Sequence, residues 1–183
     1  MTQIPPDELW ALPEKIEIGT TVLELGNKKN VTGLYRDWYL DQGLQYVSLD
    51  INGLDGAVPL DMRYAIEPDE IMNGMERGFD LVTNFGFSEH VDNQLACWHN
   101  IHNFVGVGGW LSICMPMMPD WKGHGLWMPE LKWYHEFAQL NGYDYEMKIW
   151  DRKRRTICAR MQKTHDDEFT MPVGMIHASG GVK

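Results

Sequence analysis

The sequence predicts a single α/β domain in which helices cover both faces of a mostly parallel sheet. Short apolar segments alternate with amphipathic helical segments through most of the chain, whereas the last two strand-like segments are separated by a short turn. Right-handed crossovers on both faces of such a sheet produce a doubly wound three-layer α/β/α sandwich. A chain of 183 residues is long enough for one domain of this kind with a substantial core.

Two short apolar segments near the N-terminus predict the first two strands. Residues 21–25 are short, mostly apolar and β-branched at their start, as a buried parallel strand is, and residues 45–49 predict a second strand that ends at Asp50. A helix is expected between them, with Asn30 as its cap and Gly43 at its end. Its apolar positions recur at helical spacing and form one stripe: Val31, Leu34, Tyr35, Trp38 and Tyr39.

The middle of the chain predicts three further strands. Residues 57–60 predict a very short third strand, which we expect at a sheet edge because Pro59 has no amide hydrogen for a ladder. Residues 79–83 and 110–115 predict the fourth and fifth strands. Two helices are expected between them: a short one after Pro68, with Ile71, Met72 and Met75 inward, and one from Asp92, with Leu95, Trp98, Ile101 and Val105 inward.

The C-terminal part predicts an antiparallel hairpin. Residues 143–149 and 157–161 alternate apolar and polar side chains and have only a tight connection between them. A helix with Pro129 in its first turn is expected before this hairpin, and Gly142 ends it. The expected organisation is an N-terminal extension at 1–19, the α/β domain at 20–163 and a polar tail at 164–183.

Composition and charge exclude several classes of protein. Hydrophobic residues make up 44% and charged residues 23%, and no apolar run is long enough to span a membrane. The net charge of −10 repels nucleic acid, whose affinity for proteins comes largely from phosphate neutralisation. Three cysteines without CxxC spacing predict reduced, buried thiols rather than a disulfide framework. We therefore expect a cytoplasmic protein with neither a membrane nor a nucleic-acid partner.

Polar and acidic residues recur where the predicted strands end. In a doubly wound sheet, ligands bind beyond the carboxyl ends of the strands, at the point where the winding reverses. An acid at the end of the second strand can accept both hydroxyls of a ribose. A single acid more often caps a turn, but the repetition at several strand ends favours a small-ligand site. The residues at these ends are Glu24, Gly26, Asp50, Asp61, Asn84 and Phe85.

The order of these segments resembles a known family. VLELGNKKN, YVSLD, PLDMR, FDLVTNFGFSEHV and VGVGGWLSICMP are similar to the successive motifs of class I S-adenosylmethionine-dependent methyltransferases, from about residue 20 to residue 163. SEHV followed by GVGG resembles the small-molecule methyltransferases, including those of quinone biosynthesis. The resemblance implies a Rossmann-like sheet of seven strands in the order 3-2-1-4-5-7-6, with S-adenosylmethionine as cofactor and a small-molecule acceptor.

The resemblance also implies roles at the methionine end of the donor. Glu24 and Gly26 would line the methionine portion, with the backbone of Asn27 nearby. Asn84 and Phe85 would lie beside the sulfonium, where their backbone carbonyls can meet the amino group.

At the nucleoside end, the resemblance implies four more residues. Asp50 would hold the ribose hydroxyls, and Ile51 beside it belongs to the same implied site. Asp61 with Met62 would face the adenine edge.

Two histidines are candidates for a general base. His90 and His124 are chosen because histidine titrates near neutrality. The segment around His124 falls where the family builds part of its acceptor side, although packing over the sheet edge explains it equally well. Its apolar side chains are Met117, Met118, Trp121 and Trp127.

No metal ion is expected from the sequence. Some quinone-pathway relatives have an additional acid three residues before Glu89, but this position is Gly86 here. His99 and His102 have a spacing that suits a metal, yet no carboxylate or cysteine accompanies them.

The loop NKKN departs from the glycine-rich pattern of the family. Lys28 and Asn30 stand where the family has glycines, which let the backbone approach a ligand and adopt positive φ. Three functions therefore stay open. The first is a small-molecule methyltransferase, and the second is a non-catalytic ligand sensor or partner subunit of the same fold. The third is a nucleotide- or sugar-nucleotide-binding enzyme, since Lys28 and Lys29 favour an anion. The sequence names neither the acceptor nor the oligomeric state.

Overall fold

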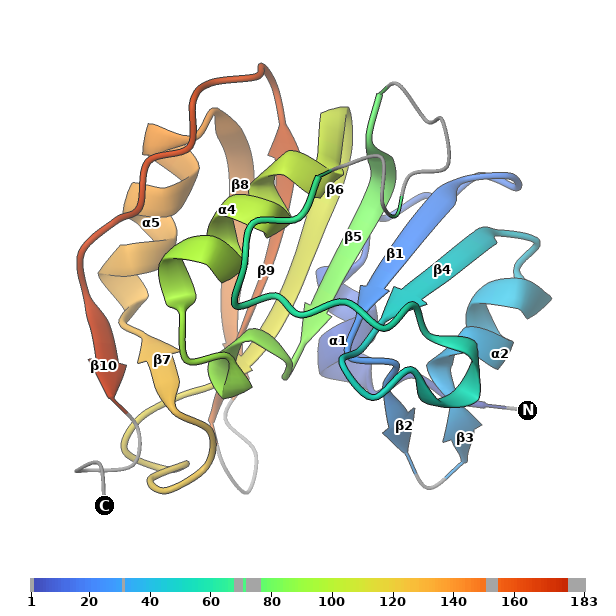
Figure 1. Ribbon diagram of the computed structural model, residues 1–183, viewed down its shortest axis with the longest axis horizontal. Coiled ribbons are helices and arrows are strands. Elements are labelled where there is room, and N and C mark those ends of the chain that lie inside the picture. The colour runs from blue at the N-terminus through green and yellow to red at the C-terminus, as the bar shows by residue number, and fades with distance from the viewer. Residues whose placement is uncertain (1, 31, 68–70, 72–76, 151–154, 178–183) are drawn as a thin grey trace.

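A sheet of six strands forms the centre of the molecule, and Figure 1 shows its arrangement. The computed structural model describes residues 2–30, 32–67, 71, 77–150 and 155–177. The strands lie in the order β4 (Gln45–Leu49), β1 (Thr21–Leu25), β5 (Phe79–Phe85), β6 (Val105–Pro116), β9 (Thr156–Lys163) and β8 (Tyr143–Trp150). The first four are parallel, whereas β9 runs antiparallel to both β6 and β8. The predicted α/β class, the mostly parallel sheet and the terminal antiparallel hairpin are confirmed.

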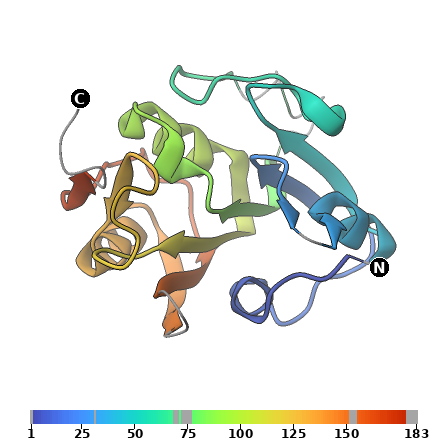
Figure 2. The same ribbon diagram turned by 90° about the horizontal axis from the view of Figure 1, so that it is seen from below.

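Helices cover both faces of this sheet, as the view from below shows (Figure 2). One face carries α4 (Gln94–Phe104) and α5 (Leu131–Leu140), and the other carries α1 (Pro6–Ala11) and α2 (Tyr35–Asp41). Each face has its own apolar core. Trp98, Trp133 and Phe137 are buried in the first core, and Tyr35 and Tyr39 in the second. The predicted three-layer sandwich is therefore present.

The predicted third strand does not form. Residues 57–60 make a single parallel bridge, from Val58 to Leu49 beside β4. Pro59 cannot continue the ladder because it has no amide hydrogen. The described residues therefore form a sheet of six strands where seven were predicted, and the seven-strand order is not confirmed. The six strands present keep the relative order that was expected of them.

The helix after β1 begins later than predicted. A small hairpin of β2 (Lys29–Asn30) and β3 (Gly33–Leu34) precedes it. Asn30 belongs to this hairpin and is not a cap, since its amide donates to the backbone carbonyl of Gln3 and its Oδ1 accepts from Thr32. Gly43 does end the helix, because its N–H donates to the carbonyl of Leu40 and its φ is +76°.

Two other helix boundaries also differ from the prediction. Asn93 caps α4 with its side chain, and Leu95 is 60% exposed although it was expected inward. Val105 was placed in this helix but is the first residue of β6. Pro129 was expected to open α5, but it lies in the short strand β7 (Trp127–Pro129).

The chain after β9 packs against the domain as far as residue 177. β10 (Met175–His177) pairs antiparallel with β7, and Thr170 exchanges two hydrogen bonds with the side chain of Asn141 at the end of α5. The predicted division of the chain at residues 19 and 163 stays a prediction. The short helix expected after Pro68 lies outside the described residues, apart from Ile71, which is buried.

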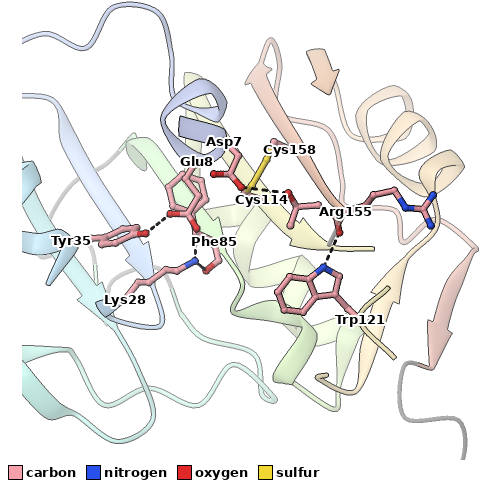
Figure 3. Close-up of a disulfide and its surroundings, with 10 residues drawn as sticks. Asp7, Glu8, Lys28, Tyr35, Phe85, Cys114, Trp121, Arg155 and Cys158 are labelled. Carbon is pink, nitrogen blue, oxygen red and sulfur yellow. Dashed lines mark hydrogen bonds and ion pairs between the residues drawn. A yellow bond between two sulfur atoms is a disulfide. The ribbon is translucent and has the colours of Figure 1, made fainter. Parts of the chain in front are cut away.

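The cysteines differ from their predicted state. Cys114 of β6 and Cys158 of β9 lie opposite each other in the antiparallel register, and the structure joins them in a disulfide (Figure 3). Cys97 is free and buried. The prediction of three reduced thiols is therefore wrong for this pair. Because disulfides are rare in the cytosol, the predicted cytoplasmic location loses the support that the cysteines gave it.

None of the helices formed by the described residues is long and apolar enough to cross a membrane.

Candidate small-ligand site

A cavity of about 530 Å³ lies at the carboxyl ends of β1, β4 and β5. These strands are parallel neighbours, so the residues that follow them meet at one edge of the sheet. Seven residues that the sequence analysis selected line this cavity: Gly26, Asp50, Ile51, Asp61, Met62, Phe85 and His90. Glu24, Asn27, Asn84 and His124 do not contribute to its wall.

Gly26 lets the chain turn tightly between β1 and the cavity. It adopts a φ of +90°, and its N–H donates to the carbonyl of Leu49 at 2.8 Å. A Cβ at this position would lie 2.7 Å from Cδ2 of Phe87, so a larger residue would displace the Phe87 ring. Phe87 lines the same cavity. The sequence analysis missed Phe87, because a single aromatic residue in a loop carries no periodic signal.

Asp50 and Ile51 follow β4 and form one side of the cavity. Oδ1 of Asp50 accepts the N–H of Asn52 at 3.0 Å, which fixes the carboxylate at the start of the turn. Ile51 is 61% exposed. An exposed apolar side chain at the cavity provides a surface on which a flat ring can pack.

Asp61 is held by Arg63, a residue for which the sequence predicted no role. Nε of Arg63 lies 2.9 Å from Oδ1 of Asp61, and Nη2 lies 2.6 Å from Oδ2. The guanidinium hydrogen bonds keep the pKa of Asp61 below its usual value. Both side chains line the cavity, so the pair presents a fixed carboxylate and a fixed cation together.

Glu24 lies beneath the cavity rather than in its wall. It is 1% exposed and accepts a hydrogen bond from the hydroxyl of Tyr46. Burial raises the pKa of Glu24 to about 8, although the hydrogen bond from Tyr46 opposes the shift. Within the described part of the chain, its Oε1 has no hydrogen-bond partner. A cation that approached this carboxyl would favour its ionised form.

Lys28 points its ammonium at the strand end of β5 (Figure 3). Nζ donates to the carbonyl oxygen of Phe85 at 2.7 Å and to Oε1 of Glu8 at 2.6 Å. Glu8 belongs to α1 and also accepts the hydroxyl of Tyr35 at 2.5 Å. The Lys28 side chain is 28% exposed and lines the cavity. The carbonyl oxygen of Phe85 therefore already accepts a hydrogen bond from a positively charged side chain of the protein itself.

Asn27 and Asn84 support the loops around the cavity. Asn27 has a φ of +42°, and its amide donates to the carbonyl of Leu54 at 2.9 Å. Asn84 is buried and exchanges two hydrogen bonds with Ser88, one from its amide to Oγ at 2.8 Å and one from the Ser88 N–H at 3.1 Å. The side chain of Asn84 thereby fixes the turn η2 (Ser88–His90) that follows β5.

His90 and His124, the two predicted general bases, both lie beside the buried carboxyl group of Glu89. Nε2 of His90 lies 3.7 Å and Nε2 of His124 lies 3.6 Å from Oε1 of Glu89. The two imidazole rings have centroids 5.1 Å apart. Burial raises the pKa of Glu89 to about 7, and burial together with the nearby His124 lowers the pKa of His90. The sequence could not place His124 here, because an irregular connection separates it from Glu89.

The other histidine pair has structural contacts. His102 is buried, its Nδ1 accepts the hydroxyl of Tyr143 at 3.2 Å, and its Nε2 lies 3.0 Å from the carbonyl oxygen of Asp167. His99 contacts the side chain of Asn103. His102 therefore points inward, whereas His99 is partly exposed.

The connection from β6 to β7 packs over the sheet edge and also reaches the cavity. The indole N–H of Trp121 donates to the carbonyl of Arg155 at 2.8 Å, which ties the connection to the start of β9. Leu126 lines the cavity, and its N–H donates to the carbonyl of Glu89 at 2.6 Å. The segment therefore packs against the sheet, as one of the two alternatives predicted, whereas its role on an acceptor side stays a prediction.

Solved structures share the fold of this chain, although no protein-family model and no curated protein sequence matches it. The 1,6-didemethyltoxoflavin-N1-methyltransferase of Burkholderia thailandensis has a TM-score of 0.58 at 13% identity, over 81% of this chain and 72% of that one. A TehB-like S-adenosylmethionine-dependent methyltransferase of Corynebacterium glutamicum has a TM-score of 0.58 at 18% identity, over 86% and 87%. The N-methyltransferase NodS of Bradyrhizobium japonicum has a TM-score of 0.53 at 12% identity, over 81% and 88%. The chain thus has the class I S-adenosylmethionine-dependent methyltransferase fold.

Proposed function

We propose that this protein is an S-adenosylmethionine-dependent methyltransferase that acts on a small-molecule acceptor. The observation that carries the proposal is the convergence of Gly26, Asp50, Asp61 and Phe85 on one cavity at the carboxyl edge of a methyltransferase-type sheet. Its volume of about 530 Å³ falls within the usual range of small-ligand sites. The B. thailandensis structure with this fold contains 1,6-didemethyltoxoflavin and S-adenosylhomocysteine.

The nucleoside part of the donor lies along the β4 side of the cavity. Asp50 accepts the ribose hydroxyls, and Ile51 and Met62 pack against the adenine ring. The bidentate contact with Arg63 holds the carboxylate of Asp61 in one orientation, so that it can accept the exocyclic amino group.

The methionine part lies over the end of β1, beside Gly26 and the backbone of Asn27. The backbone carbonyls of Asn84 and Phe85 accept its amino group, and the buried carboxyl of Glu24 below them favours the positive charge. Because Lys28 already donates to the carbonyl of Phe85, its ammonium must move when the donor binds. The donor is already activated, so catalysis consists largely of aligning the acceptor with the sulfonium.

The acceptor lies beside Glu89, His90 and His124, where His90 lines the cavity. A lone pair of the acceptor forms the new bond to the methyl carbon while the electron pair of the carbon–sulfur bond stays on sulfur. The proton of the acceptor passes to the neutral imidazole of His90 or His124. The position of His90 in the cavity wall supports this role, and the ring of His124 lies beside it with its centroid 5.1 Å away.

Calorimetric titration with S-adenosylmethionine and S-adenosylhomocysteine tests the proposal. We expect one binding event for each ligand. Asp50→Asn should weaken it by about 10-fold or more, because a hydrogen bond to a charged group contributes about 1.5–3 kcal/mol. Asp41→Asn is the matched control, since Asp41 is exposed at the end of α2 and lies outside the cavity. The absence of heat and of any thermal shift at millimolar ligand would contradict the proposal.

The contacts of Lys28 support a second candidate function, a non-catalytic ligand sensor or partner subunit of the same fold. A cationic side chain at the carbonyl that should receive the donor weakens donor binding. Incubation with labelled donor and a panel of metabolites separates the two functions. Transfer of the methyl group to any acceptor excludes the non-catalytic function.

A further inference from the structure

The carboxylate of Glu89 is buried without a hydrogen-bond partner in the described part of the chain. Its side chain has no exposed surface, and neither oxygen has a hydrogen-bond partner among the residues that the structure describes. Leaving a buried polar group unpaired costs free energy, so such a group in a folded protein requires an explanation. Two imidazoles lie near it but outside hydrogen-bond distance, at 3.6 and 3.7 Å from Oε1.

We propose that Glu89, His90 and His124 bind a divalent transition-metal ion of the Zn²⁺ class. One ligand atom of each residue lies within 4.8 Å of the other two. Ligand atoms bound tetrahedrally to zinc at 2.0–2.1 Å are roughly 3.4 Å apart, so small rotations of the side chains bring these three around one ion. The ion satisfies the carboxylate of Glu89 and takes the place of the missing hydrogen bonds.

The ligand set indicates the kind of ion. Two imidazoles and one carboxylate are the protein ligands of several zinc sites that keep a fourth position open, and imidazole suits zinc and its neighbours in the first transition row. Magnesium prefers oxygen ligands and octahedral geometry, which this set does not offer. The two imidazole side chains are about half exposed, so an ion can enter from solvent.

The surrounding backbone holds these ligands in place. The turn that contains Glu89 and His90 is fixed by the two hydrogen bonds between Asn84 and Ser88. The segment that contains His124 is fixed by the bond from the Leu126 N–H to the Glu89 carbonyl. Gly125 lies so close to Glu89 that a Cβ there would be 2.8 Å from Cγ of the acid. Because the glycine allows this approach, it brings His124 to the buried carboxylate.

The position of the ion relative to the cavity suggests its use, and this step rests on the proposed function. His90 and Gly86 line the cavity, and a Cβ on Gly86 would lie 3.3 Å from Oε1 of Glu89. The open coordination position then faces the acceptor, which binds the ion through an oxygen or nitrogen atom. Coordination lowers the pKa of that atom. Because both imidazoles are then bound to the ion and no longer act as bases, the proton of the acceptor is released to water. The lone pair forms the bond to the methyl carbon, and the carbon–sulfur electron pair stays on the donor.

The binding test uses Zn²⁺ alone, without donor or acceptor. Protein stripped with a chelator is titrated by calorimetry, and Co²⁺ is used as an absorption probe of the coordination geometry. We expect one ion for each chain. Glu89→Gln and His124→Ala should each lower Zn²⁺ affinity by more than about 100-fold, since loss of even an outer-shell partner costs 10- to 100-fold. Thermal unfolding without metal verifies that each variant is folded.

Two controls make the test specific. His99→Ala removes a partly exposed histidine of α4 and should bind Zn²⁺ as the unchanged protein does. The double variant Cys114→Ala/Cys158→Ala removes both sulfurs of a second group, Asp7, Cys114 and Cys158, and should also bind normally. Failure of Zn²⁺ to bind, equal binding by folded Glu89→Gln, or preference for Mg²⁺ would overturn the proposal. Since donor binding is measured separately, failure of the methyltransferase proposal would leave this result interpretable.

Discussion

Removal of the Lys28 ammonium should strengthen donor binding. Nζ of Lys28 donates to the carbonyl of Phe85 and to the carboxylate of Glu8. In the proposed complex, the amino group of S-adenosylmethionine needs the same carbonyl. The unchanged protein must therefore break the contacts of Lys28 before the donor can bind, whereas Lys28→Ala has nothing to displace.

The size of the effect follows from these contacts. A hydrogen bond to a charged group contributes about 1.5–3 kcal/mol, and the displaced ammonium regains hydration because its side chain is already 28% exposed. We therefore expect Lys28→Ala to bind S-adenosylmethionine about 10- to 100-fold more tightly. The same change leaves Glu8, which is 8% exposed, with the hydroxyl of Tyr35 as its remaining partner. The free energy of unfolding should fall by about 1–3 kcal/mol.

Calorimetry with two ligands measures this prediction. S-adenosylmethionine carries the amino group, whereas 5′-methylthioadenosine lacks it, so the affinity of the second ligand should not change in Lys28→Ala. Lys29→Ala is the matched control, because Lys29 is the exposed neighbour and does not line the cavity. Weaker binding of S-adenosylmethionine to Lys28→Ala, or an equal gain for both ligands, would refute the reasoning.

Three further predictions concern Glu24, His102 and Gly26. Because burial raises the pKa of Glu24 to about 8, S-adenosylmethionine affinity should increase as pH rises toward 8 and the carboxyl ionises. Calorimetry at several pH values should show no such increase for Glu24→Gln. An increase in that variant would contradict the role of Glu24 in binding the donor. Burial lowers the pKa of His102 to about 4, so between pH 6.5 and 4 the unfolded chain binds more protons than the native one. The free energy of unfolding should then fall by up to about 3 kcal/mol as pH drops through this range, and urea unfolding should show a smaller loss in His102→Gln. Gly26→Ala should abolish S-adenosylhomocysteine binding, since its Cβ meets Phe87 at 2.7 Å, whereas Gly108→Ala, at a similar positive φ with no atom near its Cβ, should bind as before.

Patterns that are local in the chain predicted the frame of the fold. The bounds of β1 and β4 agree with the segments predicted at 21–25 and 45–49, because both segments are short and rich in the apolar residues that buried parallel strands contain. The prediction of a third strand was wrong because Pro59 limits residues 57–60 to a single β-bridge with β4. The prediction of a helix cap at Asn30 was wrong because its side-chain amide donates a hydrogen bond to the carbonyl of Gln3, a partner distant in the sequence.

The sequence predicted those residues of the candidate site whose position follows from the order of the parallel strands. Parallel strands bring their carboxyl ends together, so Asp50, Asp61 and Phe85 meet at one cavity. The contact of Lys28 with Glu8 was not predictable, since it depends on how the N-terminal helix packs. The approach of His124 to Glu89 depends on the path of an irregular connection, for which periodicity gives no information.

A crystal structure of the protein with S-adenosylhomocysteine tests the central claim most directly. We expect the ribose at the carboxylate of Asp50, the adenine beside Ile51 and Asp61, and the amino group at the carbonyl of Phe85, with the Lys28 ammonium displaced. A cavity in which Lys28 keeps its contacts with Phe85 and Glu8, and which holds no S-adenosylhomocysteine at millimolar concentration, would contradict it.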